Sequence, residues 1–200
     1  MKSDICYLNG KEGRMNVLNE VEKTAGYCGL NHKERLQLRL LAEELTGMVE
    51  GRIGEYSAKF WIEREQHMYK LHLELDRKLS EADEKSLLKT ATTNRGQVPT
   101  GMMDRIGMFL DNIVRNQGHK MEQIASGGVV MNGMGSMYAA ATQEADGIRW
   151  SLTSYTKEVE KEEEPDRMDD LERSIIAKLA DDIVVRIRGS KAEVIVEKTF

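Results

Sequence analysis

The sequence predicts an α+β protein in which a mostly antiparallel sheet is covered by helices on one face. Apolar and polar residues alternate over residues 56–62 and again over 69–75, which is typical of two half-buried strands. The same alternation returns over 183–188 and 192–200, on either side of a Gly189-Ser190-Lys191 turn. From Asn31 to Gly51, by contrast, apolar residues recur at helical spacing.

Length and composition are those of one soluble domain. The chain has 200 residues, of which 40% are hydrophobic and 32% charged, with a formal net charge of −5. A chain of this length buries a sizeable core. The acidic balance gives no electrostatic reason to expect nucleic acid or an anionic membrane as a partner. No apolar run is long enough to span a membrane, and the start lacks the apolar core of a signal peptide, so we expect a cytoplasmic protein.

The first third of the chain predicts a short strand followed by two helices. Ile5 and Tyr7 indicate the strand, and the first helix is expected over 12–25. Asn31 and Glu34 have the spacing of a capping box at the start of the second helix, 31–51. One apolar stripe of this helix contains Leu38, Leu41 and Leu45. A second stripe, with Leu36 and Leu40, lies on roughly the opposite side, so we expect the helix to be covered on both sides.

The rest of the chain contains the hairpin, a long middle and a closing hairpin. A short polar turn at 65–67 joins the strands of the first hairpin. Helices are expected over 80–90 and 102–118, and a strand over 148–153. Residues 157–170 form a dense acidic segment, which we interpret as a solvated linker. Seven of the 12 methionines lie between Met102 and Met137, where they fit core packing or an adaptable partner surface.

Glu43 and Gly47 lie on the second stripe of the 31–51 helix and allow two interpretations. They are four residues apart and therefore neighbours on the helix surface. In one interpretation, Glu43 is a carboxylate at the rim of the molecule and Gly47 lets another backbone come close. In the other, the two residues form the floor of a ligand pocket.

The stretch LLAEELTGMVEG, which contains Glu43 and Gly47, resembles the N-box helix of the GHKL (Bergerat-fold, histidine-kinase-like) ATPases, and most of all that of the anti-sigma-factor serine kinases. The closing helix and hairpin, ERSIIAKLADDIVVRIRGSKAEVIVEKTF, resemble the end of the same kinases. The resemblance implies one domain over 1–200, built as a two-layer α/β sandwich with a mixed, mostly antiparallel sheet and helices on one face. It also implies an enlarged lid-like region at about 80–147.

The same resemblance implies roles for five residues. Glu43 matches the glutamate that polarises the attacking group, whereas Gly47 stands where the family has its Mg-binding Asn. Asp76 matches the adenine-binding aspartate of the G1 box, although neither glycine of that box follows it, and it also fits an aspartate making a local turn. Gly133 and Gly135 resemble a glycine-rich phosphate loop, a pattern that ordinary loops share.

Two functional hypotheses follow from the resemblance. In the first, the chain is a degenerate ATPase-fold protein that acts as a regulatory nucleotide- or partner-binding module. Its partner would be of the sigma-factor or anti-anti-sigma-factor type, and it could assemble as a homodimer. In the alternative, it is an active serine/threonine kinase or ATPase that uses ATP and Mg²⁺, with Glu44 or Thr46 replacing the missing Asn. The four histidines are scattered, with no HExxH or other helical pairing, so no metal ligand is assigned.

Overall fold

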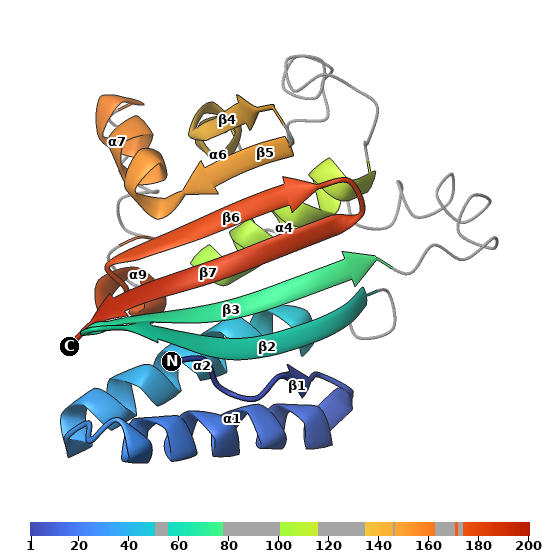
Figure 1. Ribbon diagram of the computed structural model, residues 1–200. Coiled ribbons are helices and arrows are strands. Elements are labelled where there is room, and N and C mark those ends of the chain that lie inside the picture. Colours follow the sequence, from blue (N-terminus) through green and yellow to red (C-terminus); the bar gives the residue numbers. More distant parts are fainter. Residues whose placement is uncertain (51–55, 78–100, 116–134, 146, 163–170, 172–173) are drawn as a thin grey trace.

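The computed structural model describes residues 1–50, 56–77, 101–115, 135–145, 147–162, 171 and 174–200. Its centre is a seven-stranded sheet with the order β1-β2-β3-β7-β6-β5-β4 (Figure 1). Every ladder in these residues is antiparallel. The α+β class is therefore confirmed, but the predicted mixed sheet is wrong for the described strands. The pairs β2–β3 and β6–β7 are hairpins. Antiparallel strands can be joined by a short turn, whereas parallel strands need a long crossover connection.

Two hairpins supply the middle of the sheet, as predicted. Strands β2 (Tyr56–Glu65) and β3 (Met68–Arg77) meet at a tight turn in which Gln66 has a φ of 55°. Strands β6 (Asp182–Arg188) and β7 (Lys191–Thr199) form the closing hairpin. The pairing of β3 with β7 joins the two hairpins into one sheet. Residues more than 100 positions apart thus become direct neighbours.

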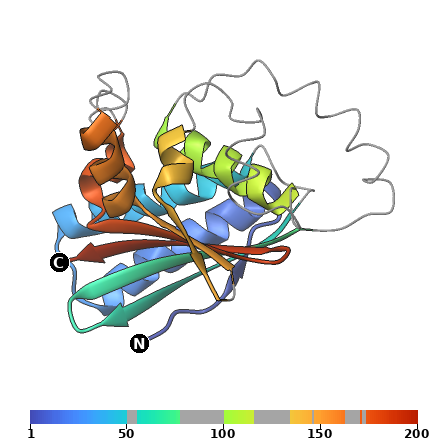
Figure 2. The same ribbon diagram turned by 90° about the horizontal axis from the view of Figure 1, so that it is seen from above.

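The register separates a core face from an open face. One row across the strands contains Phe60, Leu73, Val194, Val185 and Trp150, all fully buried in the main apolar core. The residue next to each of these along its strand points to the opposite face, because side chains alternate along a strand. Figure 2 shows the helices gathered on the core side of the sheet, which confirms the prediction of helices on one face.

Helices α1 (Gly10–Tyr27) and α2 (His32–Glu50) pack against each other beside β1 (Cys6–Tyr7), which forms one edge of the sheet. The predicted capping box is present. The Glu34 amide donates to Asn31 Oδ1 at 3.1 Å, and the Asn31 amide donates to Glu34 Oε2 at 2.8 Å. The stripe of Leu38, Leu41 and Leu45 is fully buried, because it faces the sheet.

The second stripe of α2 corrects the prediction that this helix is covered on both sides. Leu36 is 47% exposed and Leu40 is 38% exposed. No described element packs over these two side chains closely enough to bury them. Apolar spacing alone does not distinguish a buried stripe from an exposed one, since single apolar side chains are common on protein surfaces.

The remaining elements cover the other half of the sheet. Helix α4 (Met102–Arg115) has the predicted amphipathic character, and its Met102 and Met103 are buried in the core. Short helix α6 (Gly135–Ala139), strand β4 (Ala141–Glu144) and strand β5 (Gly147–Ser151) follow. Strand β4 was not predicted, because its ATQE sequence is mostly exposed at the edge of the sheet.

Helix α7 (Leu152–Glu162) corrects two sequence predictions. The strand expected over 148–153 ends at Ser151, and the start of the expected acidic linker is helical. The Ser151 hydroxyl accepts from the Ser154 amide at 3.2 Å and so caps the first turn. Tyr155 and Val159, one turn apart, are fully buried, which holds this charged helix against the sheet. Short helix α9 (Ile175–Leu179), capped by Ser174, leads into β6.

Several predictions fall outside the part of the chain that the structure describes. They are the helix predicted over 80–90, Gly133, and the acidic segment over 163–170. Of the predicted lid-like region at about 80–147, the structure describes only 101–115, 135–145 and 147. Among the described helices, none is both long and apolar enough to cross a membrane.

Candidate ligand cavity

A cavity of about 460 Å³ lies among helices α1, α2, α4 and α9. Its volume is within the range of small-molecule sites in proteins. The lining comes from segments that are far apart in the sequence: Arg14, Glu43, Glu44, Gly47, Met48, Gly101, Met102, Met103, Asp104, Ser174 and Ile175. Apolar side chains of α2, α4 and α9 and carboxylates of α2 and α4 therefore line the same cavity.

Glu43 and Gly47 both line this cavity, as the pocket-floor interpretation requires. They occupy successive turns of α2, which places them on one face of the helix. A Cβ atom built on Gly47 would meet no atom within 4 Å. The interpretation that Gly47 admits another backbone is therefore wrong for the described structure. The glycine leaves open space on the cavity side of α2.

The Glu43 carboxylate is held by an ion pair within α2. Arg39 Nε donates to Glu43 Oε1 at 3.0 Å, and Arg39 Nη1 donates to Glu22 Oε1 of α1 at 3.1 Å. The hydrogen bond to Glu22, and then that to Glu43, raises the pKa of Arg39 above its usual range. Glu43 is therefore paired with a permanent cation at the rim of the cavity.

The two residues expected to replace the missing Asn differ in position. Glu44 lines the cavity, whereas the Thr46 hydroxyl donates to the Ala42 carbonyl at 2.7 Å inside its own helix. Thr46 is 1% exposed, so its oxygen is committed to the backbone and faces no ligand. Within the described ranges, no group of three or more His, Cys, Asp or Glu side chains is arranged to hold a metal ion.

Asp76 does not line the cavity. It lies opposite Ser57 of β2 and opposite Lys191 of β7, where it is the last residue of the β3–β7 ladder. Its Oδ1 accepts from the hydroxyl of Ser190, in the turn of the closing hairpin, at 3.2 Å. The described contacts of Asp76 thus join β3 to the β6–β7 turn. The side-chain partner of Asp76 lies 114 residues away, so this contact is not the local turn that the alternative interpretation expected.

The glycines assigned to phosphate binding are not brought to this cavity. Gly135 begins α6, is exposed and does not line the cavity. Gly133 lies outside the described residues. Of the four assigned residues that the structure describes, it brings Glu43 and Gly47 to one cavity and leaves Asp76 and Gly135 outside it.

Sequence reasoning missed most of the other lining residues. Arg14 comes from α1, Asp104 from the first turn of α4 and Ser174 from the cap of α9. None belongs to a motif, and Asp104 and Ser174 are ordinary residue types for the first turn and the cap of a helix. Only the packing of four helices brings them together, so no local signal in the sequence could have identified them.

A scan of the chain against protein-family models found no match, and a search of curated proteins also found none. The resemblance to the histidine-kinase-like ATPases therefore rests on the quoted motifs.

Proposed function

We propose that the chain is a regulatory module of the histidine-kinase-like ATPase type that binds a nucleoside-like ligand in the α1–α2–α4–α9 cavity and does not turn it over. The observation that carries this proposal is the presence of Glu43 and Gly47, the two N-box-like positions, on the wall of one cavity of about 460 Å³. The chain order of helix, hairpin, and closing helix and hairpin is the order that the family resemblance implies.

The charges of the lining favour a ligand with hydrogen-bond donors over a free triphosphate. Glu43, Glu44 and Asp104 contribute three carboxylates and Arg14 contributes one cation, while Arg39 pairs with Glu43 at 3.0 Å. Carboxylates accept hydrogen bonds from amino and hydroxyl groups and repel phosphates that carry no bound cation. A purine amino group and a ribose supply such donors. The apolar side chains of Met48 and Met102 suit the faces of a base.

Absence of turnover is supported by the surroundings of the assigned catalytic groups. Phosphoryl transfer depends on Mg²⁺ to stabilise the developing charge. Gly47 offers no side-chain ligand, Thr46 is bonded to its own helix, and Asp76 lies outside the cavity. Glu43 Oε1 already accepts from Arg39 Nε at 3.0 Å, so this oxygen is engaged within α2.

A thermal-shift titration tests the proposal. Adenosine, guanosine, ATP, ADP and GTP are each added to the full chain with and without Mg²⁺, because a bound ligand raises the apparent melting temperature by mass action. We expect a concentration-dependent rise with a nucleoside, and a smaller rise with the matching triphosphate in the absence of Mg²⁺. Gly47→Leu fills the open space beside α2 and should abolish the rise while the protein stays folded.

Asp76→Asn is the matched control, since Asp76 is outside the cavity; its titration should match the wild type. Phosphate release from ATP is measured in parallel and should stay at background. Mg-dependent ATP hydrolysis that Glu43→Ala abolishes would replace the proposal with the active kinase or ATPase alternative. If no nucleoside or nucleotide shifts the melting temperature, the proposed function is overturned.

A further inference from the structure

Glu44 of α2 is a carboxylate of the cavity wall that the described residues leave without a partner. Its side chain is partly buried and lines the cavity. Among the hydrogen bonds and ion pairs of the described residues, none involves its carboxylate. A partly buried carboxylate without a donor is unfavourable, because it has lost water and gained no replacement. Glu44 therefore has two acceptor oxygens for a ligand in the cavity.

The other charged side chains of the wall are already engaged. Glu43 Oε1 accepts from Arg39 Nε at 3.0 Å. Arg14 and Asp104 each interact with another residue. Glu44 directly follows Glu43, so the two side chains leave the helix about 100° apart and do not share the contact with Arg39. Glu44 thus differs from its charged neighbours in the cavity.

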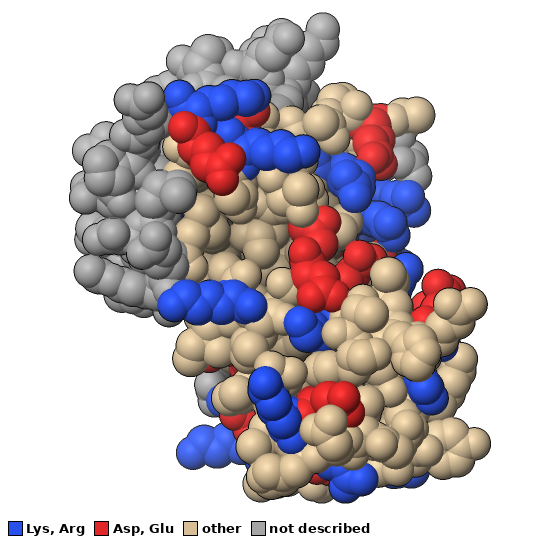
Figure 3. All heavy atoms as spheres, turned by 90° about the vertical axis from the view of Figure 1, so that its left-hand side faces the viewer, with Lys and Arg blue, Asp and Glu red and all other residues tan. Residues whose placement is uncertain are grey.

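Carboxylates on another part of the described surface lie beside cations. Figure 3 shows acidic and basic side chains interspersed on the side of the molecule that lies at the left of Figure 1. Lys198 binds Asp181 at 3.0 Å, and Lys161 binds Glu158 at 2.7 Å. Glu44, by contrast, lines a cavity and pairs with none of the described cations.

The space beside Glu44 suits a flat apolar group. Gly47, on the next turn of α2, leaves room, because a Cβ built there would meet no atom within 4 Å. Met48, four residues after Glu44, is 3% exposed, and Met102 and Met103 of α4 line the same cavity. Methionine side chains adapt to irregular apolar surfaces and to aromatic rings. A planar ligand that lies against these methionines can therefore present its edge to Glu44.

A carboxylate distinguishes the edges of the purine bases. Its two oxygens are acceptors only, so they match an edge that carries two neighbouring N–H donors. Guanine has such an edge, formed by N1–H and the 2-amino group. Adenine has one amino group beside N1, and N1 is an acceptor that a carboxylate repels. Hypoxanthine, the base of inosine, keeps N1–H and lacks the amino group.

We propose that Glu44 selects guanine as the base of the ligand, by accepting from N1–H and from the 2-amino group with its two oxygens. This inference rests on the proposed function, since it names the base that the nucleoside-binding cavity takes. Two charge-assisted hydrogen bonds side by side are stronger than neutral ones and fix the orientation of the ring. Asp76, which the family resemblance assigned to the base, lies outside the cavity, so Glu44 takes over base recognition.

Isothermal titration calorimetry of the full chain with guanosine, 2′-deoxyguanosine, inosine and adenosine tests the proposal. The first two should bind alike. Inosine and adenosine should bind at least about ten-fold more weakly, because each lacks one donor of the matched edge. Glu44→Gln keeps the shape of the side chain and presents one acceptor and one donor, which fits adenine. This variant should bind guanosine at least about ten-fold more weakly than the wild type, and adenosine more tightly.

Glu160→Gln is the matched control, because it makes the same change at an exposed position of α7 outside the cavity. It should bind all four nucleosides like the wild type. The melting temperature of Glu44→Gln without ligand should not fall below that of the wild type, since Glu44 has no partner among the described residues. A preference that reverses between two bases is an effect that damage to the fold does not produce.

The outcomes separate this inference from the proposed function. The inference alone is overturned if the wild type binds adenosine or inosine as tightly as guanosine, or if Glu44→Gln keeps the preference for guanosine. It is also overturned if removal of the 2′-hydroxyl weakens binding and the loss of the amino group does not, because Glu44 would then bind the sugar. If none of the four nucleosides binds, the proposed function and the inference fail together.

Discussion

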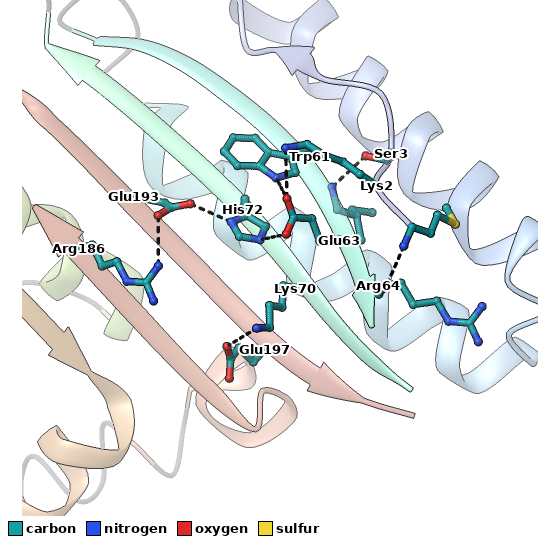
Figure 4. Close-up of polar contacts among 12 residues, drawn as sticks. Lys2, Ser3, Trp61, Glu63, Arg64, Lys70, His72, Arg186, Glu193 and Glu197 are labelled. Carbon is teal, nitrogen blue, oxygen red and sulfur yellow. Dashed lines mark hydrogen bonds and ion pairs between the residues drawn. The ribbon is translucent and has the colours of Figure 1, made fainter. Parts of the chain in front are cut away.

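His72 shows how far a residue's role depends on its neighbours. Its place among the polar positions of an alternating strand predicts a solvated residue or one on the face of the sheet. His72 does lie on the open face of the sheet, but its side chain is only 7% exposed. Its ring stacks on Trp61 with centroids 4.8 Å apart and 7° between the planes. Nδ1 is 2.9 Å from Glu193, and Nε2 is 3.6 Å from Glu63 (Figure 4). Neutral or protonated, this imidazole connects three strands.

The contact between His72 and Glu193 predicts a pH dependence of stability. The hydrogen bond from His72, against the opposing effect of burial, holds the pKa of Glu193 below its usual range. A carboxyl whose folded pKa is lowered stabilises the fold above its unfolded pKa of about 4.3, and this contribution is lost as the pH falls through the folded value. We expect urea denaturation to show Glu193→Gln less stable than the wild type at pH 6, with the difference shrinking toward pH 3.

Glu160→Gln, at an exposed position on α7, should leave the free energy of unfolding nearly unchanged at both pH values. A difference between Glu193→Gln and the wild type that is constant over this pH range would contradict the assigned pairing.

At the scale of elements, Gly13 of α1 and Gly47 of α2 have opposite surroundings. A Cβ on Gly47 meets nothing within 4 Å, whereas a Cβ on Gly13 would lie 2.7 Å from the Tyr7 carbonyl oxygen and 2.8 Å from Leu8 Cα. Gly13 is thus required for α1 to approach the chain leaving β1. Gly47 has no such packing reason in the described structure and costs α2 conformational entropy.

Alanine at each position tests this difference. Gly47→Ala should raise the free energy of unfolding by about 1 kcal/mol, the usual gain of alanine over glycine inside a helix. Gly13→Ala should lower it, because backbone atoms would have to move. Urea denaturation of the two variants measures both effects. A Gly47→Ala variant less stable than the wild type would show that a close neighbour of α2 exists at that point.

Elements with a clear period were predicted well, and the others were not. Strands β2, β3, β6 and β7 follow from alternation and turn residues, and α2 follows from its stripe and capping box. The boundary between β5 and α7 was misplaced, because alternation through Ser151 and Leu152 fits the end of a strand as well as the start of a capped helix.

At the scale of the whole molecule, β7 holds the sheet together. It lies between β3 and β6, so both hairpins depend on it. The Phe200 amide also donates to the His67 carbonyl at 3.0 Å, which ties the end of the chain to the first hairpin. Pairing of segments this far apart in sequence closes a long loop and is expected to form late in folding.

Truncation after Arg188 tests this dependence. The shortened chain lacks β7 and should lose its cooperative thermal unfolding transition in circular dichroism, because β3 and β6 would become unpaired edges beside an open core. Removal of residues 1–4, at the β1 edge of the sheet, should lower the melting temperature and leave the transition cooperative. A cooperative transition in the chain without β7 would show that the first hairpin and its helices form an independent core.

The sequence by itself determined the α+β class, the two hairpins, the long α2 helix with its cap and the placement of Glu43 and Gly47 on one helix face, because these depend on the local period and on residues within a few positions of one another. Only the tertiary structure decided which strands are neighbours, that the second stripe of α2 is exposed and that Asp76 binds Ser190 outside the cavity. These features arise from the register and packing of segments far apart in the chain, for which a local pattern carries no information.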